Sequence, residues 1–264
     1  MNFCGNRRGW YCCLFVIFGL LTAVQSTSAQ SQRGFVTTAP ATTSGEELTA
    51  QPDLWVLEVS FKKMRMISVE ITNPKTGDKK RGFVWYLAYK FANRDLERKQ
   101  SDADTAPVNE EDQPDRGPLF VPEFTLVTND NGTKQLYQDS IIPEAAAVIL
   151  RRERQPLKNS VAVVREIPKS VPAGTSPVES IYGMAMWRGI DPKTDHFTVF
   201  MGGFSNGYRT VKGPDGKPLL LKRTLVQEFW RPGDQFDQEE VEFRLKGEPK
   251  WIYRPDEPVT SKAN

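Results

Sequence analysis

Apolar and polar residues alternate along most of the chain, and the alternation begins near Asp53. Between residues 55 and 61 the large apolar side chains occupy every second position, and the same period of two returns over residues 67–71 and 83–91. Alternating aromatic and β-branched residues are typical of β-strands that bury one face. The segment 73–78, which contains Pro and Gly, separates the last two runs as a turn. We therefore predict three consecutive strands in this part of the chain.

The same pattern continues as far as residue 246. Turn residues at 129–132 indicate a β-hairpin, and Val241, Phe243 and Leu245 give the clearest alternation of all. The further strands predicted from the pattern cover residues 119–128, 133–138, 161–167, 180–188, 196–202, 219–230 and 240–246.

One segment, residues 143–152, has the pattern of a helix instead. It begins with Pro143 and Glu144, continues with three alanines and ends with Arg151 and Arg152. Proline at the first helical position, an acidic first turn and a basic last turn all favour an α-helix.

Many short strands with one short helix predict an all-β fold. About ten strands are typical of an immunoglobulin-like β-sandwich, which we place at residues 53–255, followed by a tail at 256–264. The pattern agrees equally with one large sandwich and with two halves that meet near residues 155–160.

Two polar segments lack the alternation. Residues 30–52 are rich in Ser, Thr, Ala, Gln and Gly and contain few large apolar groups, which predicts a disordered linker. Residues 94–118 are almost wholly polar, and their length and composition predict a disordered loop within the domain.

The N-terminal residues predict a secretion signal at residues 1–29. Arg7 and Arg8 precede an apolar run at residues 10–24, and small residues precede Gln30. A basic end, an apolar middle and a small-residue exit are typical of a signal peptide. The apolar run is shorter than the ~20 residues of a membrane-spanning helix. We expect cleavage and export to the periplasm, the cell envelope or the medium, with a retained anchor as the alternative.

Removal of the signal changes the composition. Cys4, Cys12 and Cys13 all lie within it, so the mature chain has no disulfide and no cysteine-bound metal. The signal also holds two of the 35 basic residues and no acidic ones, which leaves 33 basic against 33 acidic residues. This balance lacks the basic footprint of a nucleic-acid-binding protein, so no such partner is expected. An exported protein without cysteine favours a bacterial envelope.

Five strand-and-turn segments carry a family resemblance. They are residues 61–67, 84–93, 121–126, 182–187 and 229–234. In these segments the chain resembles a group of uncharacterised exported proteins from planctomycete bacteria, and the likeness covers most of residues 53–255. The resemblance implies export and implies no particular activity, because the shared segments contain no reaction chemistry.

The segment from Gly203 to Gly207 matches the G-x-S-x-G pattern of serine hydrolases, with Ser205 in the place of the nucleophile. That motif must lead into a helix, whereas residues 208–216 are interrupted by Gly and Pro. The hydrolase order also needs a histidine after the serine, and the one histidine, His196, precedes it. We therefore interpret the segment as a hairpin turn and predict no catalytic residue.

Calcium binding by oxygen ligands is the remaining metal chemistry to consider. Asp191 with Asp195, and Asp234 with Asp237, have the right residue types at close spacing. Acidic residues in turns of this kind are more often solvated, so no metal and no cofactor are expected.

Aromatic–arginine pairs at two predicted strand ends are the candidate binding residues: Trp187-Arg188 and Trp230-Arg231. With Trp55, Trp85 and Trp251 the tryptophans could form a sugar-stacking platform, although alternating strand positions favour the core.

The expected function is that of a non-enzymatic β-sandwich, acting as a structural or protein-interaction module of the cell envelope. Its expected partner is an envelope protein or a polysaccharide. The alternatives are a carbohydrate-binding module and a hydrolase with two carboxylates. Exposed tryptophans on one sheet face would favour the first alternative, and a cleft with two facing carboxylates the second.

Overall fold

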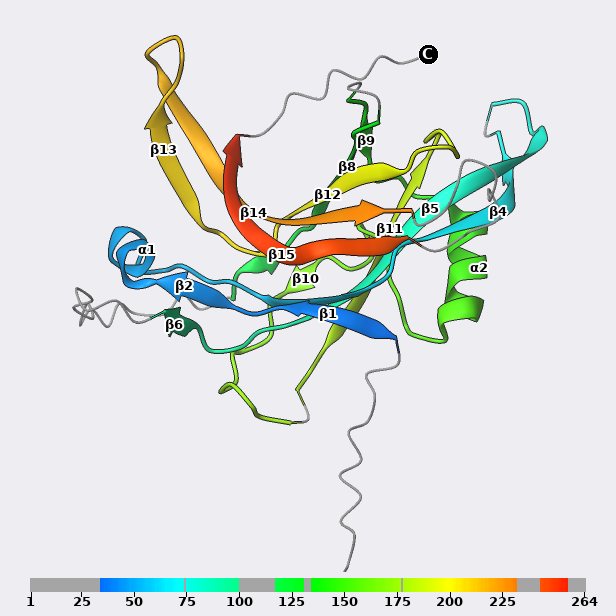
Figure 1. The fold of residues 1–264 in the computed structure, drawn as a ribbon. Helices are drawn as coiled ribbons and strands as arrows, with labels where there is room; N and C mark the ends of the chain where they lie inside the picture. Colours follow the sequence, from blue (N-terminus) through cyan, green and yellow to red (C-terminus); the bar gives the residue numbers. More distant parts are fainter. Residues whose placement is uncertain are drawn as a thin grey trace, which may run out of the picture. The chain divides into compact units, whose positions relative to one another are not determined.

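The computed structural model describes residues 34–73, 75–99, 117–130, 134–176, 178–231 and 243–255, and within these ranges the chain forms fifteen strands and two helices (Figure 1). Antiparallel pairing joins the strands of both large sheets, and the short pair β2–β6 is parallel. The prediction of a mostly β fold is confirmed.

The first large sheet, sheet I, is centred on the long strand β5. This strand pairs with β4 near its N-terminal end, with β3 near its C-terminal end and with β11 along its other edge, and β1 extends the sheet beyond β3. The strands of sheet I are β1 (Phe35–Ala39), β3 (Glu58–Lys62), β4 (Arg65–Thr72), β5 (Lys79–Ala92) and β11 (Ile181–Arg188).

The second large sheet, sheet II, is centred on β14. One edge of β14 pairs with β13 and then with β12, and its other edge pairs with β15. The order continues from β12 through β8 to β9. The strands of sheet II are β8 (Glu123–Thr128), β9 (Leu136–Gln138), β12 (His196–Gly202), β13 (Tyr208–Lys212), β14 (Pro218–Trp230) and β15 (Arg244–Pro255).

Two short strand pairs complete the β-structure. In one, β2 (Thr42–Ser44) pairs with β6 (Glu97–Lys99); in the other, β7 (Leu119–Phe120) pairs with β10 (Arg165–Glu166). The helices are α1 (Gly45–Ala50) and α2 (Pro143–Glu153), and α2 confirms the helix predicted at 143–152.

The two large sheets share one aromatic core. The ring of Trp85 on sheet I lies 5.0 Å from that of Phe197 on sheet II, and the ring of Tyr89 lies 4.9 Å from that of Phe124. All four side chains are buried. Alternation along each strand sends these residues to the same side, and their burial supplies the main stabilisation of the β-structure.

The opposite face of sheet I is covered by α2, beside β4 and β5 in Figure 1. Ala145 and Ile149 of the helix pack against a second buried cluster that includes Val84, Tyr86 and Met186 of the sheet. As a result residues 84–89 of β5 are buried on both faces, which explains the unbroken apolar run there.

The predicted linker at 30–52 is wrong for the residues that are described, 34–52. These residues form β1, β2 and α1, and Ala39 and Ala41 are buried. Ser44 caps the helix: its Oγ accepts from the N–H of Glu47 at 3.2 Å, and its own N–H donates to Glu47 Oε2 at 2.9 Å. Composition alone predicts disorder here, but residues 35–39 pair with β3 and residues 42–44 pair with β6.

The alternative of two halves meeting near 155–160 is also wrong. Strand β11 from the second half pairs with β5 from the first, and β8 from the first half pairs with β12 from the second. Residues from Gly34 onward therefore belong to one unit.

Other sequence predictions met different outcomes. The strand predicted at 161–167 is mostly a turn, with only Arg165–Glu166 in β10, and β13 was not predicted at all. The polar loop is described only at its two ends, 94–99 and 117–118. The predicted signal, the tail at 256–264 and residues 100–116 lie outside the described residues.

Candidate functional site

The face of sheet II that points away from the shared core, the outer face, is open at most positions. Strand β12 shows the pattern: Phe197, Val199 and Met201 are buried, whereas Thr198 and Phe200 on the outer face are only half-buried. In sheet I, by contrast, the face that points away from the core packs against α2.

A groove of about 350 Å³ lies on this outer face, beside the pairing of β13 with β14. We call it the sheet II groove, and its principal lining residues are Glu123, Gly202, Tyr208, Leu220, Lys222 and Thr224. Its volume lies in the range of ~300–1,000 Å³ that is typical of small-molecule sites.

The floor of the groove is hollow because Gly202 has no side chain. Gly202 pairs with Glu123 of β8 at the end of β12, so a larger residue here would fill the space above the sheet. A Cβ built on Gly202 would lie 3.5 Å from the Cβ of Glu123, which is an ordinary contact. The fold therefore tolerates a side chain at this position, and the glycine is not required by the backbone.

The walls of the groove combine apolar and charged groups. Tyr208 of β13 pairs directly with Lys222 of β14, and Leu220 follows on the same face of β14. The exposed fractions of Tyr208, Leu220 and Val121 are 54%, 49% and 48%, which is high for large apolar side chains. Glu123 and Lys222 bring one carboxylate and one ammonium to the same groove.

The rim is held by residues 203–207, the segment that matches the G-x-S-x-G pattern. Ser205 Oγ donates to the carbonyl of Trp55 at 2.9 Å and accepts from the N–H of Gly207 at 3.0 Å. Asn206 Oδ1 accepts from the N–H of Trp55 at 2.8 Å, while its Nδ2 donates to the carbonyl of Asp53 at 2.9 Å. These bonds fix the rim against the segment that precedes β3.

Ser205 is therefore a structural residue. The strand β13 follows it instead of a helix, and its hydroxyl is engaged on both sides. The segment is not a hairpin turn as predicted, because β12 and β13 both pair with β14 and not with each other. Gly203 adopts φ +80°, and a Cβ there would overlap the carbonyl oxygen of Val121.

A buried ion pair supports the groove from below. Arg223 of β14 lies 3.3 Å from Glu47 Oε2 and donates to the carbonyl of Thr42 at 2.6 Å, and the hydroxyl of Tyr253 donates to Glu47 Oε1 at 2.7 Å. Burial raises the pKa of Glu47, but hydrogen bonds from Ser44 and Tyr253 and the charge of Arg223 outweigh it and lower the pKa overall. The N-terminal segment is thereby tied to β14.

The four candidate binding residues do not form a site. Trp187 is completely buried in the shared core, and Arg231 is also buried, with its guanidinium 5.2 Å from the ring of Phe243. Arg188 is exposed at the end of β11 in sheet I, whereas Trp230 is half-buried on the outer face of sheet II. Burial of Trp85 and Trp187 also excludes them from a sugar-stacking platform, as their alternating positions predicted.

The calcium candidates also have structural roles where they are described. Asp191 Oδ1 accepts from the N–H of Lys193 at 2.9 Å in a turn, and Asp195 and His196 donate their N–H groups to Asp130. No group of three or more metal-ligating side chains occurs among the described residues. Asp234 and Asp237 lie outside them.

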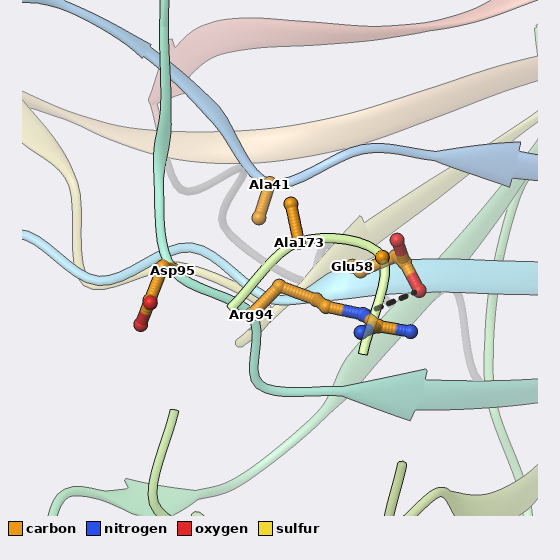
Figure 2. A pocket seen from close by; sticks show the side chains of 6 residues that line it. Ala41, Glu58, Arg94, Asp95 and Ala173 are labelled. Carbon is orange, nitrogen blue, oxygen red and sulfur yellow. Dashed lines mark ion pairs between the residues drawn. The ribbon is translucent and has the colours of Figure 1, made fainter. Parts of the chain in front are cut away.

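A second, smaller pocket of about 80 Å³ lies near the end of β5 (Figure 2). Its guanidinium, from Arg94, lies 3.6 Å from Glu58 and donates to the carbonyls of Pro172 at 3.2 Å and Thr175 at 2.7 Å. Figure 2 shows Asp95 directed away from this ion pair. Because the guanidinium of Arg94 is already bonded to Glu58 and to two carbonyls, we interpret this pocket as a structural junction.

The chain matches no known protein-family model, no curated protein and no solved structure. Within the described ranges, neither helix has the length and apolar character needed to cross a membrane.

Proposed function

We propose that this chain is an exported, non-enzymatic binding module of the cell envelope, with an immunoglobulin-like β-sandwich as its scaffold and the sheet II groove as its binding site. Export is supported by the N-terminal pattern of basic, apolar and small residues. The likeness to exported planctomycete proteins agrees with this compartment. The envelope partner is a protein or a polysaccharide.

One observation carries the proposal: the sheet II groove is open and chemically mixed, but it lacks the parts of an active site. Glu123 is the one carboxylate among its lining residues, whereas glycoside hydrolysis needs two. Ser205 at its rim is committed to hydrogen bonds with the backbone. A site with exposed apolar walls and two opposite charges suits recognition.

Binding of envelope material tests the proposal. The immobilised mature chain is presented separately with the protein and polysaccharide fractions of a bacterial envelope, and Gly202→Ala is run in parallel. We expect the wild type to retain one fraction and the variant to retain less of it. Val211→Ala serves as the control, because Val211 lies three residues after Tyr208 on β13, on the opposite face of the strand, and is not among the lining residues of the groove.

Equal retention by the wild type and Gly202→Ala would contradict the assignment of the groove. Retention of neither fraction would contradict a binding role. Release of new reducing ends or peptides from the retained fraction would show an enzyme instead.

A further inference from the structure

We propose that the sheet II groove binds a sugar unit of an oligosaccharide chain, with the ring of Tyr208 against the apolar face of the sugar. The inference rests on the proposed function and adds the class of ligand. A sugar ring has apolar C–H faces and an edge of hydroxyl groups, so a matching site needs an aromatic wall together with hydrogen-bonding groups of both kinds.

The aromatic wall is provided by Tyr208. More than half of this side chain is exposed, although it belongs to a strand that pairs along its full length with β14. Leu220 and Val121 continue the apolar surface on the same groove. Exposure of three large apolar side chains around one hollow is costly unless a ligand covers them.

The polar groups of the groove match hydroxyls. Glu123 accepts hydrogen bonds and Lys222 donates them. Sugar hydroxyls both donate and accept hydrogen bonds, so they can bond to a carboxylate and to an ammonium alike.

The floor and the rim are shaped before any ligand binds. Gly202 leaves the backbone of β12 bare, and the hydrogen bonds of Ser205 and Asn206 hold the adjoining rim. A preformed site loses little conformational entropy on binding, which suits a ligand with weak individual contacts.

Two further aromatic rings lie in line with Tyr208 along β14, outside the lining of the groove. Tyr208 pairs with Lys222, Phe200 pairs with Val226, and Trp230 belongs to β14 itself, so the three rings recur at every fourth residue of this strand. Four residues of a strand span about 13 Å. The guanidinium of Arg254 lies 4.1 Å from the Phe200 ring and that of Arg244 lies 5.8 Å from the Trp230 ring. Because guanidinium groups lie over these two rings, the stacking contact with a sugar is assigned to Tyr208.

Calorimetric titration of the mature chain tests this inference. The probes are hexasaccharides of glucose, N-acetylglucosamine, mannose, xylose and galacturonic acid, each titrated into the wild type, Tyr208→Ala, Gly202→Ala and the control Val211→Ala. We expect at least one hexasaccharide to bind. Tyr208→Ala should lower its affinity about tenfold through loss of the ring contact. Gly202→Ala should lower it about tenfold because a methyl group enters the floor.

The control should bind as the wild type does, and thermal unfolding should show that all four proteins are folded. If no hexasaccharide binds while envelope protein is retained through the groove, this inference fails and the proposed function stands. If a sugar binds equally to all four proteins, the sugar site lies elsewhere and the inference also fails. If neither sugars nor envelope fractions bind, both proposals fail.

Discussion

Glu153, the last residue of α2, is predicted to be among the most sensitive positions for stability. Its side chain is 3% exposed. Its carboxylate lies 2.7 Å from Lys62 Nζ and 3.0 Å from Arg65, and it accepts from the hydroxyl of Tyr86 at 2.6 Å. These partners come from β3, β4 and β5, so one carboxylate connects the helix to three strands of sheet I.

Glu153→Ala leaves the ammonium of Lys62 buried without its counter-charge. The side chain of Lys62 is 10% exposed, whereas that of Arg65 is 27% exposed and regains water more easily. Removal of one partner from a buried pair costs about 3–5 kcal/mol. For a chain of this size that corresponds to a fall in Tm of roughly 6–20 °C. Tyr86→Phe should cost less, about 1.5–3 kcal/mol, because it removes one hydrogen bond to a charged group.

The pH dependence gives a second readout of the same group. Burial raises the pKa of Glu153, but hydrogen bonds from Lys62 and Tyr86 and the charges of Lys62 and Arg65 outweigh it and lower the pKa overall. A lowered pKa in the folded state contributes stability above the ordinary Glu pKa, and this contribution is lost as the pH falls through the folded value. The wild type should therefore lose more stability than Glu153→Gln between neutral pH and pH values below the ordinary Glu pKa.

Urea unfolding followed by tryptophan fluorescence measures these differences, since Trp85 and Trp187 are buried in the shared core. A double-mutant cycle with Lys62→Met and Glu153→Gln isolates the pairwise energy from the packing of each side chain. If Glu153→Ala unfolds within about 1 kcal/mol of the wild type, the ion pair does not hold α2 on sheet I and the reasoning is refuted.

Three further predictions concern other buried or constrained groups. Burial raises the pKa of Asp139 despite hydrogen bonds from the Met186 N–H and the Ser160 hydroxyl. The contribution of Asp139 to the free energy of unfolding is therefore lost as the pH rises through its pKa in the folded state. Between acid and neutral pH, the urea midpoint of Asp139→Asn should fall less than that of the wild type. Gly203→Ala should cost at least about 1–2 kcal/mol by its positive φ alone, whereas Gly202→Ala should unfold near the wild-type midpoint. Ser205→Ala should cost about 1–2 kcal/mol by loss of two hydrogen bonds, and a fluorophosphonate probe should not label the folded wild type.

The sequence was most informative where structure depends on neighbouring residues. Pro143 opens α2 as its first residue, and basic residues close it at Arg151 and Arg152, so the helix could be placed within one residue. The strand predicted at 196–202 is observed with the same bounds. In both segments local preference and tertiary packing agree.

Residues 34–52 show the opposite case. Their composition resembles that of a disordered linker, yet Glu47 forms a capping box with Ser44 and an ion pair with Arg223, which lies far away in the sequence. The capping pattern, Ser44 followed three residues later by Glu47, is local and can be read from the sequence. The ion pair was not visible, because it depends on where β14 lies relative to α1.

The sequence predicts the open outer face of sheet II better than it predicts the groove on that face. Residues 84–89 form an unbroken apolar run and are all buried, which is the pattern of a strand covered on both faces. The strand at 196–202 instead alternates between buried and half-buried residues. Comparison of the two patterns identifies the sheet that keeps one face open, and Gly202 is the outward position where that alternation lacks a side chain. The gap becomes a groove because Tyr208 of β13 and Lys222 of β14 form walls beside it. The pairing of these two residues follows from the fold and could not be predicted from the sequence.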